Sequence, residues 1–175
     1  MGVQVIYGDK QANAEIVSLA LAKQNSRIEY TDEDKLLQLL LDSATAEMEN
    51  YLDSPIILRE NSQIFFDDFV TTYKIKIPFA IIKIEWLDEA GNKTVINSDD
   101  YEVFEDEITI DIEKPTNFSR ILFTVNLGYD EAEIPDDIRR AALLIFSNSE
   151  TYRESVQVKF NQSAYNLLRN YKLKW

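Results

Sequence analysis

Apolar and small residues recur every three or four positions across residues 138–152, and this spacing predicts a helix with one apolar face. Pro135 stands just before this stretch, at a first-turn position where the missing N–H of proline costs nothing. Asp136 and Asp137 follow, and acidic side chains suit the positive end of a helix dipole. Because the apolar face is broad, we expect a core helix. Arg139 and Arg140 lie off that face, and we expect them either to bridge to neighbouring subunits or to be exposed to solvent. The residues of the face are Ile138, Ala141, Ala142, Ile145, Ser149 and Tyr152.

A second and longer helical pattern covers residues 32–52. Thr31 is the expected N-cap, with Asp34 three residues later in the capping-box position. Residues 53–55 end the pattern, because a residue that precedes proline avoids the helical region. Shorter helices are predicted over residues 15–24 and 164–171.

Between residues 56 and 126 the period of the pattern changes to two, which is typical of strands. The strand-like runs are short, rich in Ile, Val, Phe and Tyr, and bounded by turn residues. Residues 89–92 link two of them as a hairpin turn, and residues 156–160 alternate like one more extended segment. Residues 3–7 fit either a short strand or an arm. The strand-like runs are 56–59, 63–69, 73–77, 81–87, 93–96, 101–104, 107–112 and 120–127.

Runs of helix and runs of strand, without regular alternation, indicate the α+β class. We expect a small helical bundle, made of the long N-terminal helix and the central helix, beside antiparallel β-hairpins or a sheet. A length of 175 residues fits one domain. Within it we expect an N-terminal arm (1–14), a core (15–155) and a C-terminal docking tail (156–175).

The charge of the chain is negative and uneven. The net charge is −13, which argues against general nucleic-acid binding, since such binding needs a basic surface. Residues 153–175 carry five basic side chains and one acidic one, a net +4, so the remainder carries −17. A basic tail on an acidic body suggests an acidic partner surface; a solvated terminus is the alternative.

The residue inventory disfavours enzyme chemistry. The chain has no Cys and no His, which removes the usual zinc ligands and the commonest general base. Four glycines form no phosphate-binding motif. No apolar run is long enough to cross a bilayer. We therefore predict no catalytic residue, cofactor or metal ligand.

One acidic cluster offers an alternative function. Paired carboxylates hydrolyse glycosides or hold Ca²⁺ or Mg²⁺ in other proteins, although charged turns and strand edges give the same pattern. A carboxylate-based cation-binding or hydrolytic module thus stays open, as does an acidic adaptor that mimics DNA. The cluster consists of Asp99, Asp100, Glu105, Asp106, Glu107 and Asp111.

Taken in order, five segments over residues 17–171 resemble the head–tail connector proteins of tailed phages, also called adaptor or head-completion proteins. The most specific segment is 123–155, in which a strand leads into Gly-Tyr, an acidic loop, Ile-Pro, a helix and Tyr-x-Arg-Glu. Residues 1–14 have no counterpart in the resemblance. The five segments read VSLALAKQNSRIE, DEDKLLQLLLDSATAEMENYLDSPI, IPFAIIKIEWLDEAG, FTVNLGYDEAEIPDDIRRAALLIFSNSETYRES and LLRNY.

The resemblance implies a structural virion protein at the neck, assembled in the host cytoplasm as a ring of expected twelve-fold symmetry. Its implied partners are the portal protein and other neck and tail proteins, with genomic DNA passing through the channel without specific binding. A structural corner is expected at Gly128, Tyr129 and Pro135. The expected portal and subunit interface comprises Arg153, Lys159, Phe160, Tyr165, Leu167, Leu168, Arg169, Tyr171, Lys172, Lys174 and Trp175.

Overall fold

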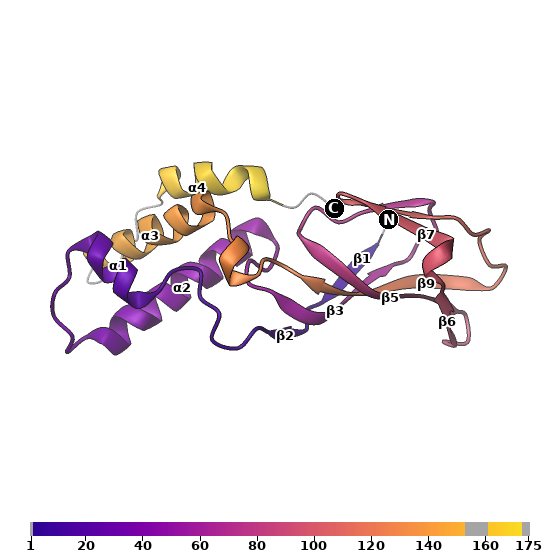
Figure 1. The fold of residues 1–175 in the computed structure, drawn as a ribbon, viewed down its shortest axis with the longest axis horizontal. Helices are drawn as coiled ribbons and strands as arrows, with labels where there is room; N and C mark the ends of the chain where they lie inside the picture. Colours follow the sequence, from indigo (N-terminus) through magenta and orange to yellow (C-terminus); the bar gives the residue numbers. More distant parts are fainter. Residues whose placement is uncertain (1, 153–160, 173–175) are drawn as a thin grey trace. The chain divides into compact units, whose positions relative to one another are not determined.

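The computed structural model describes residues 2–152 and 161–172. The chain forms two compact units, each built from separate stretches of sequence. We call them the β unit, with described residues 2–12 and 58–128, and the helical unit, with described residues 13–57, 129–152 and 161–172. Figure 1 shows the helices and the strands along the chain. The predicted α+β class is confirmed.

The helical unit packs its helices around one apolar core. Helix α1 (Leu19–Ser26) and the long helix α2 (Asp34–Leu52) come from the first stretch, and α3 (Asp136–Thr151) and α4 (Gln162–Leu168) from the second. Two 3-10 turns, η2 (Glu131–Glu133) and η3 (Arg169–Tyr171), flank them. The buried faces of α2 and α3 have the predicted spacing. They present Leu37, Leu41, Ala44, Met48 and Leu52 from α2, and Ile138, Ala141, Ala142, Ile145 and Phe146 from α3.

The β unit consists of two antiparallel sheets. The larger sheet has the order β1-β3-β9-β5-β6, with β2 also paired to β3, and the smaller has the order β4-β8-β7. A 3-10 turn, η1 (Ser98–Asp100), precedes β7. The strands are β1 (Val3–Ile6), β2 (Asp9–Lys10), β3 (Arg59–Phe66), β4 (Thr72–Lys74), β5 (Phe79–Asp88), β6 (Lys93–Ile96), β7 (Tyr101–Phe104), β8 (Glu107–Ile110) and β9 (Phe118–Leu127).

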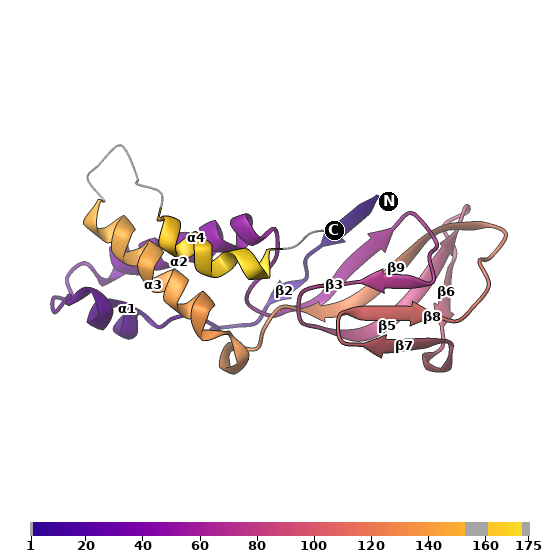
Figure 2. The ribbon, with the colours of Figure 1, turned by 90° about the horizontal axis from the view of Figure 1, so that it is seen from above.

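An aromatic cluster joins the two sheets of the β unit. Phe123 lies on the central strand β9, opposite Ile64 of β3 and Ile84 of β5. The ring of Tyr73, from β4 of the smaller sheet, lies 5.0 Å from the ring of Phe123 and 4.8 Å from that of Phe66. The smaller sheet therefore packs on one face of the larger one, as the view in Figure 2 shows for β7 and β8 over β5 and β9.

The helix starts differ from the sequence prediction. Helix α2 begins at Asp34, and its N-cap residue Glu33 makes no side-chain cap, so the Thr31 capping box predicted from sequence is wrong. Thr31 contributes instead its backbone oxygen, which accepts from the Asp34 N–H at 3.3 Å. Helix α1 begins at Leu19 because the hydroxyl of Ser18 accepts from the Leu21 N–H at 3.3 Å, which is an N-cap contact.

The first residues of the chain form a strand. The sequence pattern allowed either a short strand or an arm here, and the structure shows a strand: Val3–Ile6 pairs with β3. Beyond Ile6 the backbone passes so close to β3 that a Cβ built on Gly8 would lie 1.7 Å from the Glu60 backbone oxygen. Only glycine fits this passage. Residues 156–160, predicted to be extended, lie outside the described residues.

Candidate assembly interface

The structure separates the described part of the expected interface into buried and exposed residues. Tyr165 is 7% exposed and Leu168 is fully buried, both inside the helical unit. Leu167 and Tyr171 are half-buried, and they pack against the same core. Arg169 and Lys172 are exposed. The remaining expected residues, Arg153, Lys159, Phe160, Lys174 and Trp175, lie outside the described residues.

Helix α4 packs along α3 within the helical unit (Figures 1 and 2). Its N-cap is Asn161, with the side-chain oxygen accepting from the Ala164 N–H at 3.2 Å. The amide nitrogen of Asn161 also donates to the Leu144 backbone oxygen of α3, at 3.1 Å. Ala164, Tyr165 and Leu168 then face the core. The buried face of α4 thus stabilises the unit itself, which leaves its outer face for a partner.

The end of the described chain is tied to α2 through aromatic and charged contacts. The Tyr165 hydroxyl donates to the Glu47 carboxylate. The Tyr165 ring meets the Tyr51 ring edge-on at 4.6 Å, and the Lys172 ammonium lies 4.7 Å from the Tyr51 ring centre. Burial, followed by the hydrogen bond to Glu47, raises the pKa of Tyr165 well above its ordinary value near 10. These contacts fix the position from which Arg169 and Lys172 reach solvent.

We expect Tyr165→Phe to lower the free energy of unfolding by about 1–2 kcal/mol at neutral pH, because the Glu47 carboxylate loses a donor. The raised pKa of Tyr165 means that its contribution is complete below pH 10 and is lost as the pH rises above 10. Urea unfolding at pH 7, 10 and 11 should therefore show the variant and the parent chain converging with pH. Tyr30→Phe, at a 40% exposed tyrosine of the same unit, is the control; equal effects of both variants would contradict the prediction.

The expected corner residues lie in the segment between the end of β9 and the start of α3. Gly128 has φ +112°, a conformation that favours glycine, and its N–H donates to the Pro78 oxygen at 2.9 Å within the β unit. In the helical unit, the Tyr129 N–H donates to the Ile56 oxygen at 2.8 Å, and the half-buried ring packs on the core. Burial raises the pKa of Tyr129. Pro135 is the N-cap residue of α3, one position before the predicted place.

Arg139 holds three segments of the helical unit together. Its guanidinium donates to the backbone oxygens of Ile16 at 2.8 Å, Ile134 at 3.2 Å and Glu131. The sequence allowed either a bridge to a neighbouring subunit or exposure to solvent for Arg139; in the structure its guanidinium makes these three bonds inside its own unit, and the side chain is half-buried. Nothing in the local pattern distinguishes Arg139 from the exposed Arg140 beside it, since the acceptors are backbone atoms distant in sequence.

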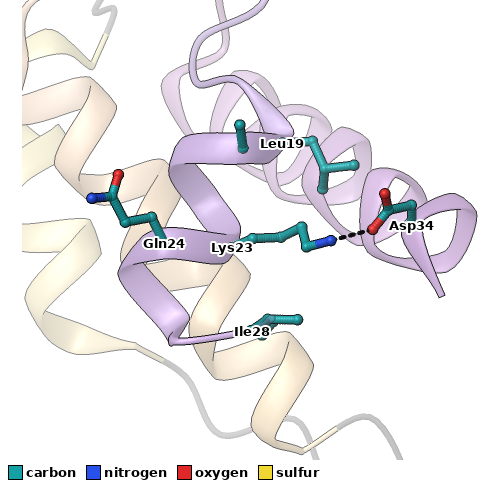
Figure 3. A pocket seen from close by; sticks show the side chains of 6 residues that line it. Leu19, Lys23, Gln24, Ile28 and Asp34 are labelled. Carbon is teal, nitrogen blue, oxygen red and sulfur yellow. Dashed lines mark hydrogen bonds and ion pairs between the residues drawn. The ribbon is translucent and has the colours of Figure 1, made fainter. Parts of the chain in front are cut away.

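A shallow cavity of about 450 Å³ opens between α1 and the start of α2 in the helical unit. Figure 3 shows Lys23 reaching across it from α1 to Asp34, with a distance of 2.5 Å between the ammonium and the carboxylate. The Lys23 ammonium also donates to the Tyr30 backbone oxygen at 2.5 Å. Leu19 and Ile28 supply apolar walls. Lys23 is the one cation in the lining, and it is paired with Asp34. This ion pair joins α1 to α2.

The acidic cluster of the sequence is spread along strands and turns of the β unit. Glu107 pairs with Lys74, and Glu105 occupies the β7–β8 turn with φ +53°. Asp111 donates its backbone N–H to the Asp100 oxygen at 2.8 Å. Within residues 2–152 and 161–172, no group of three or more Asp, Glu, His or Cys side chains is arranged to hold a metal ion.

The sequence matches the family described as phage gp6-like head-tail connector proteins over residues 16–90. The predicted resemblance to phage head–tail connectors is confirmed. A search of curated proteins gives no match. In the described part of this connector-like chain, no helix is long and apolar enough to cross a membrane.

Solved structures with the same fold come from gene transfer agent (GTA) particles. A chain of the structure titled "Neck of empty GTA particle computed with C6 symmetry" has a TM-score of 0.66 and 14% identity, over 100% of this chain and 97% of that one. A chain of "Virion of native gene transfer agent (GTA) particle" has a TM-score of 0.63 and 16% identity, with the same coverage. A chain of "Neck of native GTA particle computed with C12 symmetry" has a TM-score of 0.59 and 14% identity, over 97% of each chain. At these identities the likeness concerns the fold.

Proposed function

We propose that this protein is a structural head–tail connector, which forms a ring of identical subunits in the neck of a virus particle. The family match over residues 16–90 is the observation that carries the proposal. The likeness in fold over the whole chain to subunits of particle necks supports it. The role is mechanical: the subunit joins head to tail and catalyses no reaction.

One similar neck structure was computed with C6 symmetry and another with C12 symmetry, and the C12 symmetry supports a ring of twelve subunits here. In such a ring each subunit repeats the same contact around the axis. A modest contact between one subunit and its partner then becomes firm, because the linked contacts act at high effective concentration. The portal protein is the partner we propose on the head side, and other neck or tail proteins on the other side.

The exposed basic residues after α4 are the surface we propose for portal docking. Arg169 and Lys172 are exposed at the end of the helical unit, on a segment that the Tyr165 and Tyr51 contacts hold in place. Arginine and aromatic residues are the types that most often anchor interfaces. The sequence also predicted Arg153, Lys159 and Lys174 for this interface, and these residues lie outside the described residues. The acidic remainder of the chain would repel DNA and so let it pass through a channel.

The proposal is tested by mixing the protein with purified portal protein and measuring the mass of the complex, together with negative-stain images. We expect a complex with twelve copies of the chain per portal ring. Two separate species at every concentration would contradict the proposal.

Point substitutions test the docking surface better than a deletion of the tail. A deletion from residue 159 would remove Ala164, Tyr165 and Leu168 from the core and damage the unit. We expect Arg169→Glu to weaken portal binding by about ten-fold or more, because it reverses the charge of an exposed interface residue. Lys35→Glu makes the same change at an exposed position of the same unit. Equal binding by the two variants would contradict a docking role for Arg169.

A further inference from the structure

Strand β7 forms an open edge of the smaller sheet. Among the described residues, β7 pairs with β8 and with no other strand. Its residues are exposed from Glu102 onward, and they include two large apolar side chains, Val103 at 47% and Phe104 at 74%. Phe104 is the more exposed of the two, next to the β7–β8 turn. An open edge with exposed apolar side chains is a template for a further strand.

The register of the sheet shows which face each side chain of β7 joins. Val103 lies opposite Ile108, which in turn lies opposite Tyr73 of β4. Ile108 and Tyr73 are buried against the larger sheet, so Val103 stands on the inner face, at its margin. Glu102 and Phe104 point to the outer face, because successive side chains alternate along a strand. A strand added beside β7 would place side chains next to Val103 on the inner face of the sheet and next to Glu102 on the outer face.

The charge around β7 selects the kind of strand. Residues 97–113 contain eight acidic side chains and no Lys or Arg. A second copy of the chain that paired through its own β7 would bring the two acidic stretches together, which is unfavourable. The opposite edge differs: β4 carries Lys74, which contacts Glu107, and a lysine on an edge strand hinders pairing. The β7 edge therefore favours a basic partner strand.

We propose that the β7 edge binds an extended basic segment of another protein by strand addition. The segment has alternating residues: apolar side chains on the inner face, which extend the layer beside Val103, and Lys or Arg on the outer face, opposite Glu102. Backbone hydrogen bonds of the new ladder supply affinity, and the alternation supplies specificity. This surface lies in the β unit and shares no residue with the proposed portal-docking surface.

The test uses the full chain and a fluorescein-labelled hexapeptide, Lys-Val-Lys-Val-Lys-Val, with binding followed by fluorescence anisotropy. We expect saturable binding. The peptide Glu-Val-Glu-Val-Glu-Val should not bind, because its carboxylates meet the acidic edge. A Lys peptide with proline in place of the central valine should bind roughly ten-fold more weakly, because proline cannot donate to the ladder. Absence of saturable binding, or equal binding of the proline peptide, would overturn the proposal.

A charge reversal on the edge separates strand addition from general attraction. Glu102→Lys should weaken binding of the Lys peptide roughly five-fold, as expected for the loss of one cross-strand ion pair and its replacement by repulsion. Glu113→Lys makes the same change in net charge outside β7 and should have a smaller effect. Equal effects of the two variants would mean that net charge alone attracts the peptide, and the proposal would fail. It would also fail if Glu102→Gln caused the chain to self-associate without a change in peptide binding. The acidic side chains of the edge would then serve only to prevent self-association.

Discussion

Arg139→Ala should lower the free energy of unfolding of the helical unit by about 2–4 kcal/mol, because charge-assisted hydrogen bonds are among the stronger ones and their loss leaves acceptors unpaired. The guanidinium joins the start of α3 to η2 and to the segment that precedes α1, through the oxygens of Ile134, Glu131 and Ile16. Urea unfolding followed by circular dichroism at 222 nm, which reports on the helices, measures the effect.

Two matched variants complete the experiment on Arg139. Arg140→Ala removes the same side chain from the next, exposed position, and we expect a change within about 0.5 kcal/mol. Arg139→Lys keeps the charge but has no planar fork of donors, so it should recover only part of the stability. If Arg139→Ala and Arg140→Ala were equally stable, the three hydrogen bonds would not contribute as the structure implies.

Phe123→Ala should destabilise the β unit by about 3–5 kcal/mol, the range for a large aromatic side chain removed from a well-packed core. Phe123 is fully buried on the central strand of the larger sheet. Its ring lies 5.4 Å from that of Phe66 and 5.0 Å from that of Tyr73, so its loss opens a cavity where the two sheets meet. Hydrogen–deuterium exchange of the amides in β3, β5 and β9 measures the effect within this unit.

The control for Phe123→Ala is the same substitution at an exposed phenylalanine of the same unit. Phe104 is 74% exposed, and Phe104→Ala should leave amide exchange in the larger sheet unchanged. If both variants accelerated exchange in β9 to the same extent, the aromatic cluster would not be the core of the β unit.

Much of the fold follows from periodicity. The apolar faces of α2 and α3 could be predicted because apolar residues line one side of each helix for several turns. Leu37, Leu41 and Ala44 of α2 are examples. The strands could be predicted from alternation and from turn residues such as those at 89–92. Helix starts were less accurate: the predicted cap at Thr31 has the right residue type, yet α2 begins at Asp34, two residues after the predicted start.

The remaining features depend on contacts between distant residues. The pairing of Val3–Ile6 with β3 brings together residues about 60 positions apart in the sequence. A four-residue pattern does not indicate which strand it pairs with. For the same reason the burial of Tyr165 and Leu168 could not be predicted. An apolar residue near a chain terminus reads equally well as a docking contact or as core, and only the packing of α4 on α3 decides between them. Arg139 is similar, because its partners are backbone oxygens.

The central claim is that this chain is a connector subunit in the neck of a virus particle. Electron cryo-microscopy of the particle whose genome encodes the chain, with the chain labelled by a small tag, tests the claim most directly. We expect a ring of twelve labelled subunits around the channel between head and tail. Particles with a complete neck and no label there, or label elsewhere in the particle, would contradict the claim.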